Sequence, residues 1–424
     1  MSVAALLTPL AERLDRRLGR ARRVSVRFWD GSELPPPAGA PAEATVVVRD
    51  RAALAHVVRE PNQLGLGRAW VGGELDVEGD LSRALELTEE LGGLHLGLAD
   101  RLAVARAALR LGALGLRRPC RPAAEARVSG RLHSARRDRV AVRHHYDVSN
   151  EFYRLVLGPT MVYSCAYFES PDDSLDEAQQ RKLDLICRKL RLRQGHRLLD
   201  VGCGWGSLVL HAAARYGARA VGVTLSEPQA ELARERIREA GVSDLCEVRV
   251  ADYREVDDGP YDRIASVGMF EHVGRARLVE YFSRLAALLR PGGLLLNHGI
   301  ARLAPAKRND KSFIARFVFP DGELHHLGTV VEAVERTRLE VRDVESLREH
   351  YTLTLRCWLA NLAARPAEAI AEAGPERERV WRLYMTGSAL SFARGDISVY
   401  QLLAAAPGGE HELPLSRDAL LQAA

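Results

Sequence analysis

The sequence lacks long apolar runs and paired cysteines. No uncharged apolar stretch reaches the roughly 18 residues of a membrane-spanning helix, so we expect any membrane contact to be peripheral. The first residues, MSVAALLTPLAERLDRR, carry no basic segment before their short apolar stretch and do not fit a secretory signal. The six cysteines form no CxxC pair and no Cys/His cluster, which predicts reduced thiols and no metal site. Together these absences predict a cytoplasmic protein.

Acidic residues are scarce between residues 101 and 143. That stretch holds twelve arginines and only two acids, Glu125 and Asp138. Its beginning, ADRLAVARAALRLGALGLRR (99–118), places Leu and Ala at helical spacing with arginines between them. An amphipathic helix on an anionic membrane has this pattern, and so does a helix that connects two domains. Phospholipid headgroups and nucleic acid are the two anionic partners that such a surface suits.

The length of 424 residues is about three times that of a usual domain, so we expect two or more domains. Near the N-terminus, VSVRFW (24–29) and ATVVV (44–48) alternate like strands, and helical periodicity begins near residue 81. We therefore predict a small α+β domain over residues 1–98, a basic helix and linker over 99–143, and a catalytic domain over 144–424.

From residue 195 onward, apolar strands alternate with helices. The predicted strands are HRLLDVG (196–202), ARAVGVTLS (218–226), LCEVRVADY (245–253), YDRIASVGMF (261–270) and LLLNHGI (294–300). The predicted helices lie in SLVLHAAARYG (207–217), PQAELARERIREAG (228–241) and the segment that ends in the turn RPGG (290–293). This alternation predicts an α/β fold with a Rossmann-like doubly wound sheet, whose ligands bind at the carboxyl ends of the strands.

The turn after the first of these strands is DVGCGWG (200–206). Its glycines allow a tight turn and a close approach of the backbone to a ligand, and the next helix begins directly after it. The second strand ends at Thr224 rather than at an acid, which counts against a standard NAD site. The following Ser226-Glu227-Pro228-Gln229 fits a helix-capping box as well as a ligand contact.

Three pieces in this order, DVGCGWG, Ala251-Asp252-Tyr253 and LRPGG (289–293), resemble the class I S-adenosylmethionine-dependent methyltransferases. The resemblance implies that the glycine turn holds the amino acid part of the cofactor, that the end of the second strand faces the ribose, and that Asp252 and Tyr253 face the adenine. The implied cofactor-binding residues are Tyr163, Ser164, Asp200, Gly202, Cys203, Gly204, Gly206, Thr224, Leu225, Gln229, Asp252 and Tyr253.

Further stretches resemble the cyclopropane fatty acid synthase family, which includes the mycolic acid cyclopropane synthases. They are HYDVSNEFYRLVLGPTMVYSCAYF (145–168), SVGMFEHVG (266–274), NHGI (297–300), HYTLTLRCW (350–358), LGLGRAWVGGELD (64–76) and FARGDISVYQ (392–401). Because they span nearly the whole chain, they favour the full-length phospholipid enzymes. The resemblance implies methyl transfer from S-adenosylmethionine to a cis double bond of an unsaturated phospholipid, and loss of a proton that closes a cyclopropane ring. It also implies peripheral contact with an anionic membrane and a possible homodimer.

The base in this family is a bound bicarbonate. Its implied ligands here are Cys165, Glu271, His298, the backbone of Ile300 and Tyr351. A carboxylate accepts the single O–H of bicarbonate and leaves its other oxygens free to take a proton. Glu271 follows an apolar strand, where a charge is costly, so it is either ionised or protonated, and pairing with an arginine is the structural alternative. Taken singly, each of these side chains also fits ordinary core packing.

Aromatic side chains suit a site that forms a carbocation, because ring faces stabilise cations. The candidates are Tyr163, Tyr167, Phe168, Phe270 and Tyr351, for which core packing is the alternative. Two departures from the family pattern stand out. Ser388 occupies a position where many members carry a cysteine, which argues against a nucleophilic thiol there. His325-His326 stands where relatives often have proline, next to the expected substrate entrance.

Three other functions compete with ring formation. A fatty-acid C-methyltransferase would leave a methyl or methylene branch instead of a ring. A nucleic-acid methyltransferase is disfavoured, because no N-P-P-Y-type motif is present and aromatics do not alternate with the arginines. A lipid-binding module without catalysis predicts decay of the glycine turn or of the base site, and both are intact in the sequence.

Overall fold

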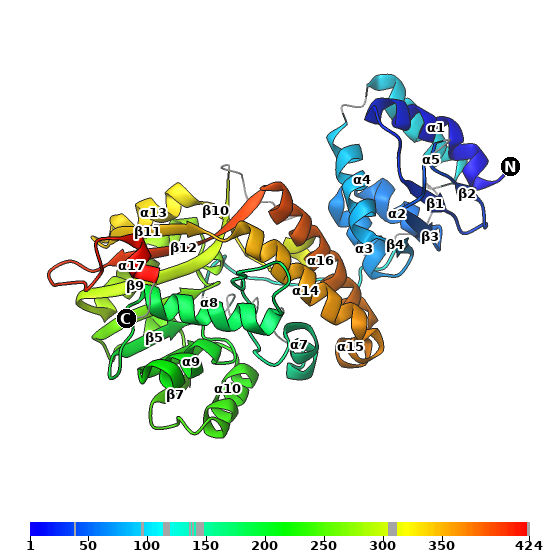
Figure 1. Ribbon diagram of the computed structural model, residues 1–424. Coiled ribbons are helices and arrows are strands. Elements are labelled where there is room, and N and C mark those ends of the chain that lie inside the picture. Colours follow the sequence, from blue (N-terminus) through cyan, green and yellow to red (C-terminus); the bar gives the residue numbers. More distant parts are fainter. Residues whose placement is uncertain are drawn as a thin grey trace. The chain divides into compact units, whose positions relative to one another are not determined.

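The computed structural model describes residues 1–37, 40–94, 97–112, 119–134, 137, 140, 148–303 and 312–421 (Figure 1). The chain forms two compact units. Unit 1 consists of Met1–Arg127, Asp310–Val318 and Ala373–Gly387, and unit 2 of Val128–Asn309, Phe319–Glu372 and Ser388–Ala424. The predicted domain limits stay a prediction, because compactness alone does not show where a segment folds independently. The limit at residue 143 and the first three residues of the stretch 145–168 lie outside the described residues.

Unit 1 is built on a four-stranded sheet in the order β2-β1-β3-β4. Its strands are β1 (Val24–Arg27), β2 (Glu33–Leu34), β3 (Ala44–Val48) and β4 (Leu75–Gly79). Its helices are α1 (Val3–Leu18), α2 (Ala52–Arg59), α3 (Gln63–Val71), α4 (Leu81–Gly93), α5 (Leu98–Arg110), α12 (Phe313–Phe317) and the first part of α16 (Pro375–Arg394). The two strands expected near the N-terminus are thus confirmed. The expected basic helix is α5, and residues 113–118 of its predicted range lie outside the described residues.

Unit 2 contains the doubly wound sheet that the sequence predicts. The strand order is β11-β12-β9-β8-β5-β6-β7, with the short β10 beside β9. The strands are β5 (Arg197–Val201), β6 (Arg219–Thr224), β7 (Cys246–Val250), β8 (Tyr261–Val267), β9 (Leu289–Arg302), β10 (His325–His326), β11 (Glu340–Ser346) and β12 (Ile397–Ala405). Strands β5 to β9 are parallel, whereas β12 runs antiparallel to both β9 and β11. The chain order reverses around β5, which is where such sheets bind ligands.

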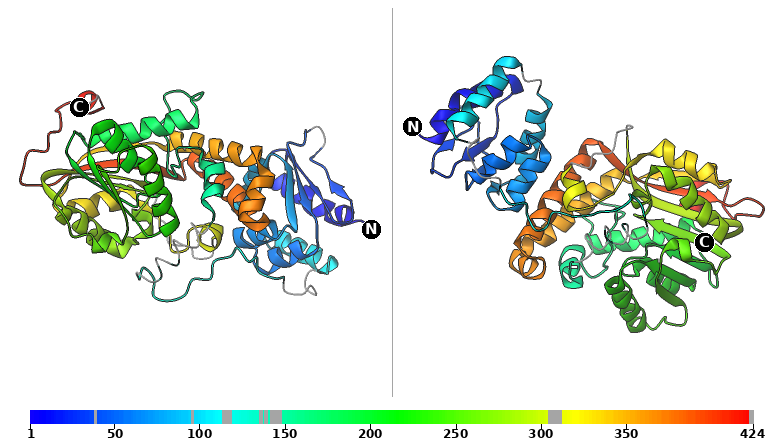
Figure 2. Two further views of the ribbon diagram at one scale, coloured as in Figure 1. Left: turned by 90° about the horizontal axis from the view of Figure 1, so that it is seen from below. Right: turned by 180° about the vertical axis from the view of Figure 1, so that it is seen from behind.

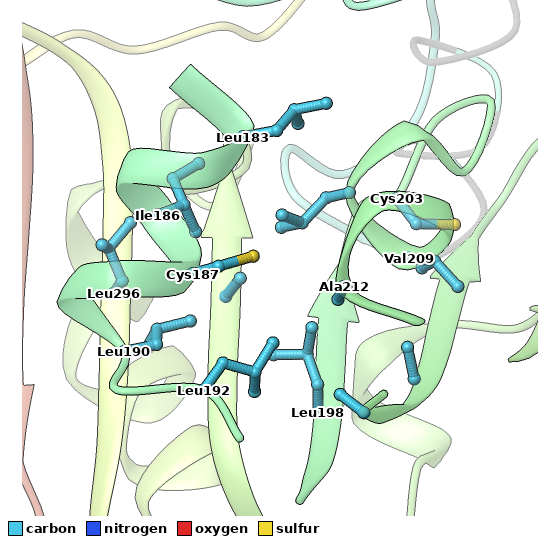
Figure 3. Close-up of a cluster of buried hydrophobic side chains, with 14 of the residues drawn as sticks. Leu183, Ile186, Cys187, Leu190, Leu192, Leu198, Cys203, Val209, Ala212 and Leu296 are labelled. Atoms are coloured by element: carbon cyan, nitrogen blue, oxygen red, sulfur yellow. The ribbon is translucent and has the colours of Figure 1, made fainter. Parts of the chain in front are cut away.

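Helices cover both faces of this sheet (Figures 1 and 2). The helices of unit 2 are α7 (Asn150–Leu157), α8 (Leu175–Lys189), α9 (Ser207–Tyr216), α10 (Glu227–Glu239), α11 (Leu278–Leu288), α13 (Leu327–Glu335), α14 (Arg348–Ala364), α15 (Pro366–Ala373), the end of α16, and α17 (Arg417–Leu421). Neighbouring strand residues alternate between the two faces: Leu198 packs with α8, α9 and α10, whereas Leu199 packs with α11 and α13. Figure 3 shows part of the apolar cluster that contains Leu198, with Leu183 and Ile186 of α8 and Val209 of α9.

Three local predictions are corrected by the structure. Strand β8 ends at Val267 instead of Phe270, so Glu271 lies on a short 3-10 turn, Phe270–His272, and does not directly follow the strand. The segment RPGG belongs to the start of β9 instead of a free turn. Helix α10 does carry a proline in its first turn, but the Ser226 side chain makes no capping hydrogen bond there. A hydrogen bond from the distant Ile300 amide holds Glu271, and a hydrogen bond from Thr224 occupies Gln229, as described below.

Within the described residues, no helix combines the length and the apolar character needed to cross a bilayer.

Candidate active site

The glycine turn Gly202–Gly206 connects β5 to α9 at the carboxyl edge of the sheet. Gly202, Gly204 and Gly206 all have positive φ, at 80°, 53° and 75°, a region that glycine adopts without strain. A Cβ on Gly202 would lie 2.5 Å from Cγ of Met269, so this position has no room for a side chain. Beside Gly204 the space is open, with no atom within 4 Å of an added Cβ. The turn therefore presents bare backbone to a ligand, as the predicted cofactor site requires.

The ends of the next two strands complete the predicted cofactor residues. Thr224 and Gln229 are buried, and the Thr224 hydroxyl donates to Oε1 of Gln229 at 2.9 Å, which explains why Gln229 does not close the capping box. Asp252 is 4% exposed and accepts from Nε and Nη2 of Arg254 at 2.8 and 2.6 Å. Leu225 and Tyr253 stay half-buried at the same edge. Thr224 ends β6, and the other four residues follow β6 or β7, so the structure brings them to one end of the sheet with the glycine turn.

Asp200 and Lys182 are two buried ionisable groups beneath the glycine turn. Burial raises the pKa of Asp200 to about 7 and lowers that of Lys182 to about 8, and the attraction between them opposes both changes. The Lys182 ammonium donates to the Ser164 hydroxyl at 2.8 Å. Gln179 fixes the same segment, because its amide donates to the Ser164 carbonyl at 2.9 Å. Ser164, predicted to touch the cofactor, is therefore held by two buried side chains of α8.

Glu271 is fully buried and is bonded through only one of its carboxylate oxygens. Its Oε1 accepts from the backbone N–H of Ile300 at 2.7 Å, whereas Oε2 has no hydrogen-bond partner. Burial raises the pKa of Glu271 to about 7, and the Ile300 amide acts in the opposite direction. No arginine pairs with this carboxylate among the described residues, so the structural alternative of a buried ion pair is not what the structure contains. The unpaired oxygen is available to a ligand.

His298 lies on β9, two residues before Ile300, and is 2% exposed. Its Nδ1 contacts Nε2 of Gln401 at 3.2 Å, and its own Nε2 has no partner. Burial lowers the pKa of His298 far below its ordinary range, and the positive charges of Lys182 and Lys189 add to this effect. The imidazole is therefore neutral. With the Gln401 amide donating to Nδ1, the proton of His298 sits on Nε2, where it can be given to an anion.

Cys165 and Tyr351 lie beside the turn that starts α14. Cys165 is fully buried, and its thiol donates to the carbonyls of Ala166 and Leu347 at 3.2 and 3.6 Å. The backbone N–H of Tyr351 donates to the same Leu347 carbonyl at 3.1 Å. Burial raises the pKa of the Cys165 thiol far above its usual range, so this thiol is neutral and not a nucleophile. The Cys165 thiol and the backbone of Tyr351 thus share the Leu347 carbonyl.

The aromatic candidates divide into two groups. Tyr163 and Tyr351 both contact Trp358, with ring centroids 5.3 and 6.0 Å apart, and Tyr351 also packs on Phe392 at 4.6 Å. These four rings therefore form one continuous row of contacts. Phe270 precedes Glu271 on the same 3-10 turn, and its ring lies 6.1 Å from that of the buried His325. His325 is one of the two positions that depart from the family pattern.

Tyr167 and Phe168 make other contacts. Tyr167 stacks on His350 at 4.8 Å, and Phe168 packs with Ala166 and Ala178. For Phe168 the packing alternative holds. Ser388, the other departure, is half-buried on α16.

Sequence reasoning missed Lys182, Gln401 and Trp358. In LDEAQQRKLDLICRK (175–189), Lys182 stands four residues after Ala178 and four before Ile186, on the apolar face of a helix. A lysine in that position is a usable signal, because such a face is buried. Trp358 and Gln401 end two of the quoted stretches, but nothing local indicates their partners.

Comparisons with known proteins find relatives that match most of the chain. Residues 133–402 match the family model described as mycolic acid cyclopropane synthetase. A probable fatty acid methyltransferase of Pseudomonas putida is 40% identical over 400 residues, covering 93% of this chain and 95% of its own. Cyclopropane mycolic acid synthase 1 of Mycobacterium tuberculosis is 39% identical over 272 residues, covering 61% of this chain and 94% of its own. The crystal structure of mycolic acid cyclopropane synthase CmaA1 complexed with SAH and CTAB superposes with a TM-score of 0.60 at 38% identity, over 63% of this chain and 98% of that one.

Proposed function

The chain belongs to the mycolic acid cyclopropane synthetase family, and from this premise we propose that it forms cyclopropane rings in phospholipid acyl chains. At the coarser level it is an S-adenosylmethionine-dependent methyltransferase that acts on fatty acids, with a class I methyltransferase fold. The finer proposal is that the methyl carbon of S-adenosylmethionine is added to a cis double bond of an unsaturated phospholipid. Loss of a proton from that carbon, taken by bound bicarbonate, then closes the ring.

One observation carries the proposal: two buried polar atoms without partners flank the same stretch of β9. They are Oε2 of Glu271 and Nε2 of His298, an acceptor and a donor. Glu271 is bonded to the amide of Ile300, two residues beyond His298, so both side chains belong to one place in the sheet. Bicarbonate has one O–H and anionic oxygens, and this pair matches those groups. Several other buried side-chain atoms of the described residues also lack a partner, so the support for a bound ligand is that an acceptor and a donor stand at the same end of β9.

The chain's own residues supply orientation, charge and protection from water. When bound, S-adenosylmethionine supplies an electrophilic methyl group, and bicarbonate supplies a proton acceptor. Glu271 would hold the O–H of that anion and His298 one of its oxygens. The neutral Cys165 thiol does not compete as a nucleophile, which matters because a carbocation alkylates free thiolates. Tyr163, Trp358 and Tyr351 offer ring faces that stabilise a cation by about 0.5 to 2 kcal/mol each.

A second candidate is a fatty-acid C-methyltransferase that leaves a methyl or methylene branch. The relative from Pseudomonas putida, which covers 93% of this chain, bears the name of a probable fatty acid methyltransferase, and this favours the alternative. The ring and the methylene branch both require loss of one proton from the added carbon, so the base site is needed for either product. The stretches SVGMFEHVG and NHGI, which carry Glu271 and His298, resemble those of the cyclopropane synthases, and this resemblance supports the ring as the product.

The test is incubation of the purified protein with methyl-labelled S-adenosylmethionine and vesicles of unsaturated phospholipid. Proton NMR of the extracted lipid distinguishes the products, because cyclopropane protons resonate at unusually high field whereas methylene protons do not. Mass alone does not suffice, since the cyclopropane and methylene products are isomers. We expect upfield ring signals that depend on added bicarbonate. Labelled lipid without these signals would support the branched product and overturn the ring.

A further inference from the structure

Helix α5 (Leu98–Arg110) in unit 1 has an apolar stripe that faces solvent. Leu98, Leu102 and Leu109 are 76%, 47% and 63% exposed. At about 100° per residue, these three positions fall within about 40° of one another on the helix surface. The exposed Ala105 lies in the same sector. Single exposed leucines need no explanation, but an aligned row of three on one 13-residue helix does.

The opposite side of α5 is fixed to the rest of unit 1. Asp100 is fully buried and pairs with Arg13 and Arg17 of α1 at 2.7 and 3.2 Å. Ala107 and Leu111 are buried on the same side, and Leu111 belongs to the apolar core of this unit. The helix therefore has one face that is docked within unit 1 and one that is not. The leucine stripe is therefore not the face through which α5 packs within unit 1.

Arginines border the stripe on both sides. By helical spacing, Arg101 lies on one side of it, and Arg106 and Arg110 lie on the other, and all three are exposed. Glu125, the next acid after α5 in the sequence, does not neutralise them, because it is buried and bound to Arg68 at 2.7 and 2.8 Å. An apolar stripe bordered by arginines on both sides is the pattern of a helix that lies in the interface of an anionic bilayer.

We propose that the outward face of α5, made of Leu98, Leu102 and Leu109 with Arg101, Arg106 and Arg110, docks on an anionic phospholipid membrane. The leucines enter the boundary between headgroups and acyl chains, and the guanidinium groups bind lipid phosphates. A second copy of the chain is a less suitable occupant, because two identical faces would bring their arginines together. The inference rests on the proposed function for its purpose, since a lipid substrate must be reached in its bilayer.

The experiment is co-sedimentation of the full chain with vesicles, in the absence of S-adenosylmethionine. One set of vesicles contains equal parts of phosphatidylglycerol and phosphatidylcholine, and the other contains phosphatidylcholine alone. The variant Leu102→Glu/Leu109→Glu changes two exposed positions. We expect it to bind anionic vesicles at least about tenfold more weakly, because two leucines lose their burial and two charges repel the surface. The matched control is Leu415→Glu, at a fully exposed position outside α5, and it binds normally.

Two further readouts separate the possible explanations. Arg101→Gln/Arg106→Gln/Arg110→Gln is expected to lose the preference for anionic vesicles and the sensitivity to salt, whereas Arg238→Gln on α10 keeps both. Activity on detergent-dispersed lipid reports on the proposed function alone and stays normal in all of these variants. If the leucine variant binds anionic vesicles like the unmodified protein, the proposal is wrong. If it instead changes the oligomeric state while vesicle binding persists, the face is a contact between copies and the membrane assignment fails.

Discussion

Glu271→Gln is expected to make the protein more stable and almost inactive at the same time. The glutamine is isosteric, so its amide oxygen can still accept from the N–H of Ile300. It removes the buried charge, whose desolvation raises the pKa of Glu271 from 4.5 to about 7. That change in pKa corresponds to roughly 3 kcal/mol of unfavourable free energy for the ionised carboxylate in the folded state.

The sign of the pH dependence follows from the raised pKa. The folded protein holds the Glu271 proton more tightly than the unfolded chain does. Ionisation of Glu271 therefore does not change the free energy of unfolding below about pH 4.5, and it lowers that free energy increasingly up to about pH 7. The glutamine variant lacks this loss. Urea unfolding at pH 5 and pH 8 should therefore show a gain in stability for the variant that is larger at pH 8 and approaches roughly 3 kcal/mol. The control Glu280→Gln, exposed on α11, should show no such gain.

Activity should fall in the same variant by about 10²- to 10⁴-fold, the usual contribution of a positioned acid or base group. Binding of S-adenosylmethionine, measured by calorimetry, should remain, because none of the predicted cofactor contacts is changed. A variant that is less stable at pH 8 and still active would show that Glu271 has a structural role. It would refute both the unpaired-oxygen interpretation and the proposed anion site.

Three other predictions concern neighbouring groups. Lys182→Met should raise the KM for S-adenosylmethionine about tenfold with a smaller change in kcat, because it removes a buried charged hydrogen-bond donor near Asp200. In the unmodified protein the KM should rise above about pH 8, as the Lys182 ammonium loses its proton. An unchanged KM would contradict this role. Gln401→Met should lower kcat and alter the tautomer of His298, read from imidazole nitrogen shifts by NMR, while a change in stability alone would indicate packing only. Cys165 should resist alkylation by iodoacetamide at pH 8 in the folded protein, because it is buried and its pKa is raised. Peptide mass spectrometry measures this, and rapid alkylation of Cys165 would refute a neutral thiol.

The sequence by itself determined the local parts of this protein. Strand and helix periodicity located the elements of the doubly wound sheet, since burial of one face imposes a repeat that is visible in neighbouring residues. The glycines of the turn after β5 are required by positive φ, a constraint that each residue carries alone. The ordered motifs also identified the family, which the comparisons confirm. In all these cases the information lies within a few residues of the feature it specifies.

Only the tertiary structure decided which distant side chains meet. Gln401 reaches His298 because β12 runs antiparallel to β9 with these two residues opposite each other, although 103 residues separate them in the chain. The amide of Ile300, not a strand end, defines the position of Glu271. For α5 the sequence left a membrane helix and a connecting helix open, and the burial of Asp100 showed which face is free. Such pairings depend on how elements pack across the whole chain, and local sequence patterns do not encode them.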